Sequence, residues 1–189
     1  MTLDFADAPT LETPRLRLRP WRDSDIEPYV AMGADPDVMA YFPRLMSRDE
    51  VLDHVRDLQE RFRRWGYGYW AIETADTPFA GFVGLSQPKI DAHFTPCVEV
   101  GWRLAPAVWG RGLATEGARA ALRFGFQDRG LPEIVAMVSV ENAASRRVAE
   151  RLGMTTDPAD DFDFPGEDWP YKRSVLYRIR REKFHEQDA

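Results

Sequence analysis

Hydrophobic and polar residues alternate from Val98 to Leu104, which is the pattern of a half-buried β-strand. Pro106 marks the end of this strand, because proline cannot donate a hydrogen bond to a sheet. After a turn that contains two glycines, small and apolar residues recur at helical spacing, at Ala114, Ala118, Ala121, Leu122 and Gly125. The stretch therefore predicts a strand, a glycine turn and a helix that can lie close to a sheet.

The other helices are indicated by capping residues and apolar stripes. Ser47 and Glu50 match a capping box in front of a stripe that runs to Gly66. Shorter helices are predicted within 23–33 and 142–153, where a capping residue precedes the apolar positions and a glycine follows them.

Strands are predicted at 11–20, 69–73, 80–85, 98–104, 134–140 and 174–179. Three consecutive strands with short connections favour an antiparallel first half, and the strand–helix–strand order that follows favours a parallel pair around the glycine-turn helix. We predict a single α/β (α+β) domain over 1–189 with a mixed central sheet of about six or seven strands. Its core would span about 11–180, with flexible tails at 1–9 and 183–189. The arginines of the first strand are expected to be solvated or to protect a sheet edge: Arg15, Arg17 and Arg19.

Composition excludes several classes of protein. The 189 residues suffice for one domain with a full core, and the six tryptophans argue against disorder. A net charge of −6 argues against a general nucleic-acid binder. Cys97 is the single cysteine, so no internal disulfide framework exists, and with three histidines no zinc-binding spacing can be assembled. With no signal-peptide pattern at 1–9 and no long apolar run, we expect a cytoplasmic protein without a membrane span.

The glycine turn carries the clearest chemistry. Gly110 and Gly112 lack a Cβ, so a ligand can approach their amides closely. Thr115 and Glu116 open the helix, where free N–H groups and the helix dipole favour an anion such as phosphate. A dinucleotide fingerprint would need a glycine at Thr115, and the spacing of a P-loop fails as well. A plain strand-to-helix turn is the alternative interpretation.

Two motifs together resemble the GNAT superfamily of N-acetyltransferases. The family's acetyl-coenzyme A loop, Gln/Arg-x-x-Gly-x-Gly/Ala, reads here as Trp109-x-x-Gly112-x-Ala114. The tryptophan departs from that pattern, but Trp-Gly-x-Gly-x-Ala-Thr-Glu looks like the branch that contains the ribosomal-protein N-terminal acetyltransferases. The second motif is Asn142-x-x-Ser145, followed by a helix that ends at Gly153-Met154. The match covers roughly 11–180.

The resemblance implies a site for acetyl-CoA as co-substrate, with no metal. It implies that strand amides bind the pantetheine arm and that the glycine turn binds the pyrophosphate. It also implies that Asn142 holds the pantetheine or acetyl region and that Ser145 lies near the sulfur. Arg111 and Arg147 would meet the phosphates. The residues expected to bind acetyl-CoA are Trp102, Arg103, Leu104, Trp109, Gly110, Arg111, Gly112, Leu113, Ala114, Thr115, Asn142 and Ser145.

Acetyl transfer to an amine needs a free amine and a leaving thiolate. Glu99, in the strand that enters the site, is our candidate for the general base, directly or through water. The alternative is an outward, solvated carboxylate. Ser145 is the candidate hydrogen-bond donor to the thiolate. Cys97 suggests a covalent acetyl-cysteine route, but no histidine partner is evident in the sequence.

The acceptor is left open between a protein N-terminal amine and a small molecule such as a polyamine, an aminoglycoside or an amino-acid derivative. An acidic loop at 157–168, followed by Trp169, would attract a cationic amine or simply be solvated. Tyr41, Phe42 and Trp169 are candidates for the acceptor pocket or for core packing, whereas Trp70 fits core packing better. The alternative function is a non-catalytic acyl-CoA-binding or regulatory domain. A homodimer is possible.

Overall fold

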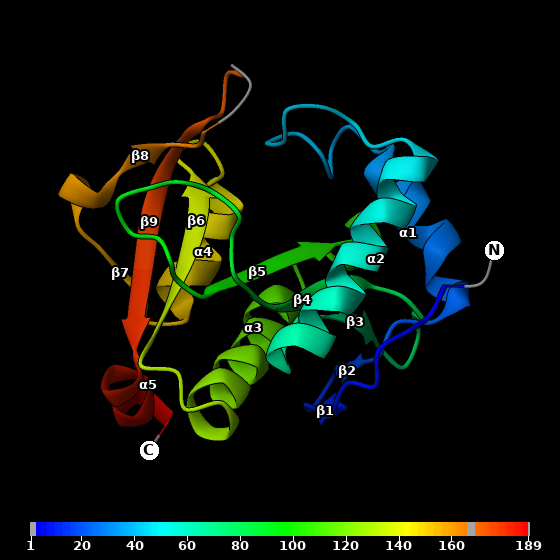
Figure 1. The fold of residues 1–189 in the computed structure, drawn as a ribbon, viewed down its shortest axis with the longest axis horizontal. Helices are drawn as coiled ribbons and strands as arrows, with labels where there is room; N and C mark the ends of the chain where they lie inside the picture. The colour runs from blue at the N-terminus through cyan, green and yellow to red at the C-terminus, as the bar shows by residue number, and fades with distance from the viewer. Residues whose placement is uncertain (1–2, 166–168, 189) are drawn as a thin grey trace.

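A computed structural model describes residues 3–165 and 169–188 of the chain. The described residues form one mixed sheet with strand order β1-β2-β3-β4-β5-β6-β9-β7, and β8 pairs with β9 (Figure 1). All pairs are antiparallel except β5 with β6. The predicted fold class is therefore confirmed. The strands are β1 Leu11–Glu12, β2 Arg17–Arg19, β3 Tyr69–Glu73, β4 Gly81–Ser86, β5 Glu99–Leu104, β6 Glu133–Ser139, β7 Thr155–Thr156, β8 Phe162–Asp163 and β9 Arg173–Arg180.

The described sheet has nine strands, more than the six or seven predicted, because its shortest strands leave no pattern in the sequence. The segment predicted as a single strand at 11–20 folds as a hairpin of β1 and β2, with Leu11 opposite Leu18. Pro14 interrupts the ladder, and the Thr13 N–H donates to the Leu16 carbonyl across the turn at 2.9 Å. The strands β7 and β8, of two residues each, carry no periodic pattern that the sequence could display.

Helices cover both faces of the sheet. On one face, α1 (Ile26–Gly33) and α2 (Arg48–Trp65) share a core with Ala71 and Phe82 of the first strands. On the other face, α3 (Leu113–Arg123) packs on Val83 and Val100, and α4 (Ala143–Arg151) contacts α3 and β6. One π turn extends α3 to Asp128. The last helix, α5 (Arg181–Asp188), lies at the foot of β9 (Figure 1).

The helix boundaries follow the capping residues that the sequence displays. The Ser47 side chain accepts from the Glu50 N–H, and Glu50 in turn accepts from the Ser47 N–H at 2.8 Å. Gly66 closes α2 in the left-handed region at φ 71°. Asn142 caps α4, where its Oδ1 accepts from the Ser145 N–H at 3.0 Å.

Arg19 is buried, which corrects the expectation of a solvated basic face. Its side chain is 2% exposed and forms a two-pronged ion pair with Asp25, with both N–O distances at 2.8 Å. The Nε atom also donates to Glu73 at 2.5 Å. The sequence does not reveal this because Asp25 and Glu73 belong to separate elements that only the tertiary fold brings to Arg19.

The residues expected to form an N-terminal tail touch the core. Ala6 and Ala8 are buried, and the Ala6 N–H donates to the Gln59 side chain at 2.9 Å. The Trp70 indole donates to the Pro9 carbonyl at 2.7 Å, and Trp70 is a core residue, as its pattern indicated. Near the other terminus, Phe184 is fully buried. None of the helices in the described ranges is long and apolar enough to cross a membrane.

Candidate active site

The central feature of the site is the place where β5 and β6 separate. The two strands are paired only at Glu99 and Val135, whereas β5 stays paired with β4 along its whole length. The Val98 carbonyl accepts from the Val135 N–H on the β6 side, and the Ala105 N–H donates to Ala80 on the β4 side. Backbone groups of alternate residues point to opposite edges of a strand. Those of Val100, Trp102 and Leu104 therefore point to the open edge, and Figure 1 shows β5 crossing between the two halves of the sheet.

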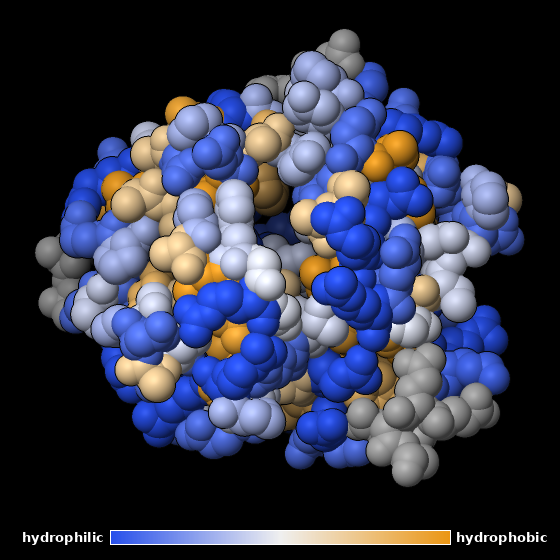
Figure 2. Space-filling view, turned by 180° about the vertical axis from the view of Figure 1, so that it is seen from behind, coloured by the Kyte–Doolittle hydropathy of each residue, from blue (hydrophilic) through white to orange (hydrophobic). Residues whose placement is uncertain are grey.

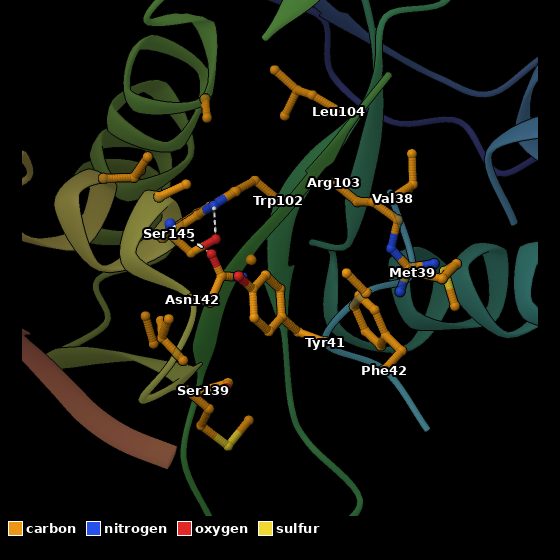
Figure 3. A pocket seen from close by; sticks show the side chains of 18 of the residues that line it. Val38, Met39, Tyr41, Phe42, Trp102, Arg103, Leu104, Ser139, Asn142 and Ser145 are labelled. Carbon is orange, nitrogen blue, oxygen red and sulfur yellow. Dashed lines mark hydrogen bonds between the residues drawn. The ribbon is translucent and has the colours of Figure 1, made fainter. Parts of the chain in front are cut away.

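This opening belongs to a cavity of about 1240 Å³. Seen from behind the view of Figure 1, the molecule is hollowed near the middle of that face (Figure 2). The loop between α1 and α2 lines one wall with Tyr41 and Phe42 (Figure 3). The ring centroids of Tyr41 and Tyr171, which comes from the C-terminal half, are 5.3 Å apart. All the large hydrophobic residues that are exposed in the described structure line this cavity: Phe42, Leu45, Trp109 and Tyr171. Such a gathering of exposed apolar side chains is typical of a binding site.

The glycine turn forms one end of the cavity. Gly110 and Gly112 have φ angles of 73° and 77°, in the left-handed region that favours glycine. A Cβ at Gly110 would meet no atom within 4 Å, so the space beside the turn is open. Thr115, in the first turn of α3, contributes a buried hydroxyl that has no hydrogen-bond partner. The turn thus offers free amide and hydroxyl donors where the sequence predicted a phosphate site.

Glu99 reaches the cavity from the face of β5 that carries α1 and α2. Its Oε1 accepts a hydrogen bond from the Tyr69 hydroxyl at 3.3 Å. Burial raises the pKa of Glu99 to about 7, and the positive charge of Arg61 and the bond from Tyr69 offset only part of that effect. A carboxyl group with this pKa can accept a proton near neutral pH, as a general base must.

Ser145 reaches the cavity from the opposite face. Its Oγ lies 3.3 Å from the Trp102 Nε1, as the dashed line in Figure 3 shows. Because an indole N–H can only donate, Ser145 accepts this bond and keeps its own O–H proton for another partner. Glu99 and Ser145 therefore flank the open edge of β5, one on each side.

The arginines take three different positions. Arg111 points to Asp76 at 3.5 Å and does not line the cavity, whereas Arg147 and Arg151 do line it. Arg103 is not placed to bind pantetheine: its backbone pairs with Phe82 of β4 and its side chain lies on the α1–α2 side. Side-chain alternation along β5 explains this position, because Arg103 shares a face with Glu99 and not with Trp102.

Comparison with known proteins assigns the family. The family model described as an acetyltransferase (GNAT) domain matches residues 15–155. The chain belongs to the GNAT acetyltransferases. It is 34% identical over 146 residues to the uncharacterised protein YkkB of Bacillus subtilis, with 76% of this chain and 84% of YkkB aligned. It is 33% identical over 156 residues to an FsC-acetyl coenzyme A-N(2)-transacetylase of Aspergillus fumigatus, with 78% of this chain and 65% of that protein aligned.

Solved GNAT structures have the same fold. An acetyltransferase of Agrobacterium tumefaciens superposes with a TM-score of 0.75 at 28% identity, covering 95% of this chain and 98% of that one. A spermidine N-acetyltransferase of Vibrio cholerae, solved with CoA and spermine, superposes with a TM-score of 0.71 at 20% identity, covering 92% and 99% of the two chains. At that identity the second likeness concerns the fold alone.

Several side chains of this GNAT domain were missed or left open by the sequence. Tyr69 was missed as the partner of Glu99; it lies over Gly101, where a Cβ would come within 2.5 Å of its hydroxyl. The space for the tyrosine ring becomes evident only from the strand register, which places Gly84 opposite Gly101. His54 is enclosed and hydrogen-bonded to the Tyr29 hydroxyl at 2.5 Å, and burial lowers its pKa to about 4. It is therefore neutral at pH 7.

Cys97 lies away from the GNAT cavity, in a separate pocket of about 360 Å³. Burial and the charge of Glu99 raise the pKa of its thiol to about 11, so little thiolate exists at neutral pH. His93, the histidine nearest in sequence, pairs with Asp160 at 3.1 Å. No metal-binding group of three His, Cys, Asp or Glu side chains occurs among the described residues.

The acidic loop contributes aromatic and apolar side chains to the cavity more than acidic ones. Asp160 pairs with Arg178 at 2.8 Å, and Asp163 lies 3.4 Å from Arg173. Phe164, Pro165 and Trp169 line the cavity instead. The acids at 167 and 168 lie outside the described residues.

Proposed function

We propose that this GNAT protein transfers an acetyl group from acetyl-CoA to a primary amine by direct attack in a ternary complex. The observation that carries the proposal is the position of Glu99 beside the open edge of β5, where burial raises its pKa to about 7. The relative from Aspergillus fumigatus, named as an acetyl coenzyme A-N(2)-transacetylase, supports acetylation of an amine nitrogen.

The donor would lie along the open edge. The backbone groups of Trp102 and Leu104, which lie beyond the last pairing of β5 with β6, suit the amides of the pantetheine arm, although the Leu104 carbonyl already accepts from the Trp109 indole at 2.8 Å. The pyrophosphate would occupy the turn at Gly110–Gly112, within reach of the buried Thr115 hydroxyl.

In this arrangement the amine nitrogen attacks the thioester carbonyl carbon, a C–N bond forms and the C–S bond breaks. Glu99 takes the amine proton, directly or through water. The thiolate leaves beside Ser145, whose free O–H can donate to it. The thiol's reference pKa near 8.5 makes a single hydrogen bond a sufficient aid.

The free energy needed to deprotonate the acceptor decides how much a base matters. An alkylammonium with a pKa near 10.4 costs about 4 to 5 kcal/mol to deprotonate at pH 7, whereas an α-ammonium with a pKa near 7.7–8.0 costs about 1 kcal/mol. A protein N-terminus of the kind acetylated by the ribosomal-protein branch would therefore depend less on Glu99 than a small alkylamine would.

Release of free thiol from acetyl-CoA, measured against a panel of primary amines, tests the proposal. The panel contains peptides with free N-termini, polyamines, aminoglycosides and amino-acid derivatives. We expect thiol release with at least one class of amine. A non-catalytic acyl-CoA-binding domain would instead show a thermal shift with acetyl-CoA and no thiol with any amine.

A further inference from the structure

Arg103 is a charged side chain whose surroundings provide no counter-charge. Its Nη1 lies 3.4 Å from the Tyr29 hydroxyl and 3.6 Å from the Met46 sulfur. Its Nε is buried and has no hydrogen-bond partner. The Cζ atom lies 4.0 Å from the centroid of the Phe42 ring and 5.4 Å from that of Phe82. Among the residues that the structure describes, every one of these contacts is with a neutral group.

An unpaired guanidinium in such a setting is costly. Burial lowers the pKa of Arg103, yet arginine stays protonated at neutral pH, so the charge persists. Proteins normally offset the cost of removing such a charge from water by an ion pair. Arg19 shows the usual solution in this same chain, because it is held by both Asp25 and Glu73.

The other cations on this side of the cavity already have carboxylate partners. Arg44 pairs with Glu50, and Arg61 pairs with Asp57 at 2.6 Å. Lys89 also pairs with Asp57, at 2.7 Å. On the cavity wall shared with α1 and α2, Arg103 is therefore the cation that has no acidic partner among the described residues.

The position of Arg103 relative to Glu99 suits an acceptor and not the acetyl donor. Both side chains lie on the same face of β5, separated by Gly101. Four residues of a strand span about 13 Å between Cα atoms, and a long arginine side chain can shorten that separation. Figure 3 shows Arg103 on the side of Met39 and Phe42, across β5 from Asn142 and Ser145. A molecule whose amine meets Glu99 would thus have its other end near Arg103.

We propose that the acceptor amine carries an anionic oxygen group, a carboxylate or a phosphate, which pairs with Arg103 while the amine faces Glu99. This inference rests on the proposed function, and it narrows the acceptor to amino acids, peptides with a nearby carboxylate, or amino phosphates. The planar guanidinium fork matches the oxygens of both anions. The flat Phe42 ring would pack against the acceptor at the entrance, since it is 42% exposed.

A polyamine fits this wall poorly. Its second ammonium group would meet the positive charge of Arg103. Of the described carboxylates on this wall, Glu50 is already engaged by Arg44 and by Ser47, and Asp37 is an exposed residue. Glu99 has to accept the proton of the reacting amine. The likeness to a spermidine N-acetyltransferase concerns the fold and gives no argument for a polyamine acceptor here.

Matched pairs of amines test the inference. Each pair consists of an amino acid or dipeptide with a free carboxylate and the corresponding carboxamide, with aminoalkyl phosphates and spermidine measured alongside. Thiol release gives kcat/KM, compared at equal concentrations of free amine. For the wild type we expect the anionic member to be preferred. Arg103→Gln should lower kcat/KM for anionic acceptors by about 30-fold or more, which is the lower end of the effect of removing one partner of a buried charge pair. The kcat/KM for carboxamides should change little.

Three controls separate the outcomes. Arg103→Gln should leave the KM for acetyl-CoA unchanged, because Arg103 points away from the open edge. Arg48→Gln makes the same change of charge on an exposed pair outside the cavity and should not alter the preference. Arg103→Met serves as a second variant if the glutamine protein does not fold. Thiol release with carboxamides or spermidine at least as efficient as with anions, or an equal loss for all acceptors in Arg103→Gln, overturns the inference. The absence of thiol with every amine overturns the proposed function instead.

Discussion

Replacing Glu99 by glutamine should have two opposite effects near neutral pH, a gain in stability and a loss of activity. In the folded protein the pKa of Glu99 is raised from 4.5 to about 7, mainly by burial. The native state therefore holds the proton more tightly than the unfolded chain does. The stability due to this group is fully present below about pH 4.5 and is lost as the pH rises through about 7. Glutamine does not titrate, so Glu99→Gln lacks this loss.

The size of the effect follows from the shift in pKa. A rise from 4.5 to about 7 corresponds to about 3 kcal/mol, at about 1.4 kcal/mol per unit. The stability of Glu99→Gln relative to the wild type should increase by about this amount between pH 4.5 and pH 8. In a protein of this size, 1 kcal/mol moves the Tm by about 2–4 °C, so the gap in Tm should widen by roughly 6–12 °C. Over the same range the variant should lose about 10²- to 10⁴-fold in kcat/KM, the usual contribution of a general base.

Urea and thermal denaturation of both proteins from pH 4.5 to 8, together with pH–rate profiles from thiol release, measure both effects. The exposed Glu60 lies outside the cavity and provides a control for the loss of a carboxylate, because Glu60→Gln should keep the kcat/KM of the wild type. A constant gap between Glu99→Gln and the wild type would refute the raised pKa. Full turnover by Glu99→Gln across pH 6 to 9 would remove Glu99 from the role of base.

Three further predictions concern other parts of the chain. Gly112→Ala should raise the KM for acetyl-CoA by tenfold or more, because it strains a left-handed residue and adds a methyl group at the glycine turn. The control Gly130→Ala, at φ 65° outside the site, should lose similar stability with an unchanged KM, and equal KM values for the two variants would contradict the prediction. Arg19→Met should destabilise the protein by about 3–5 kcal/mol in urea denaturation, because it strands the buried Asp25, and a loss below about 1 kcal/mol would contradict a buried ion pair. Cys97→Ser should keep its kcat, and mass spectrometry of the wild type with acetyl-CoA should find no acetyl-cysteine; a covalent adduct that disappears in the variant would restore the cysteine route.

The features that the sequence predicts well are those determined by neighbouring residues. The capping box of Ser47 and Glu50, the αL glycine at Gly66 and the N-cap of Asn142 each depend on residues within a few positions of one another. The alternation along β5 predicts in the same way that Glu99 and Trp102 lie on opposite faces.

The features that the sequence does not predict depend on contacts between distant segments. Arg19 looks like any solvated strand arginine until the fold brings Asp25 and Glu73 to it. The hydrogen bond from Tyr69 to Glu99 joins two strands that are not neighbours in the sheet, and glycines in the strands leave room for the tyrosine ring. Arg103 was assigned to the donor because the family motif includes its strand, but the register turns both its backbone and its side chain away from the donor.

The unpaired edge of β5 also limits which thioesters the protein can use. Its free backbone groups recur at every second residue, so they are separated by about 6.6–6.8 Å. A thioester gains hydrogen bonds there only if its own peptide-like groups repeat at a comparable interval. A short acyl thioester without such groups would leave the polar edge to water and would be bound by the acetyl group alone. Discrimination between donors would therefore come in part from the unpaired side of one strand.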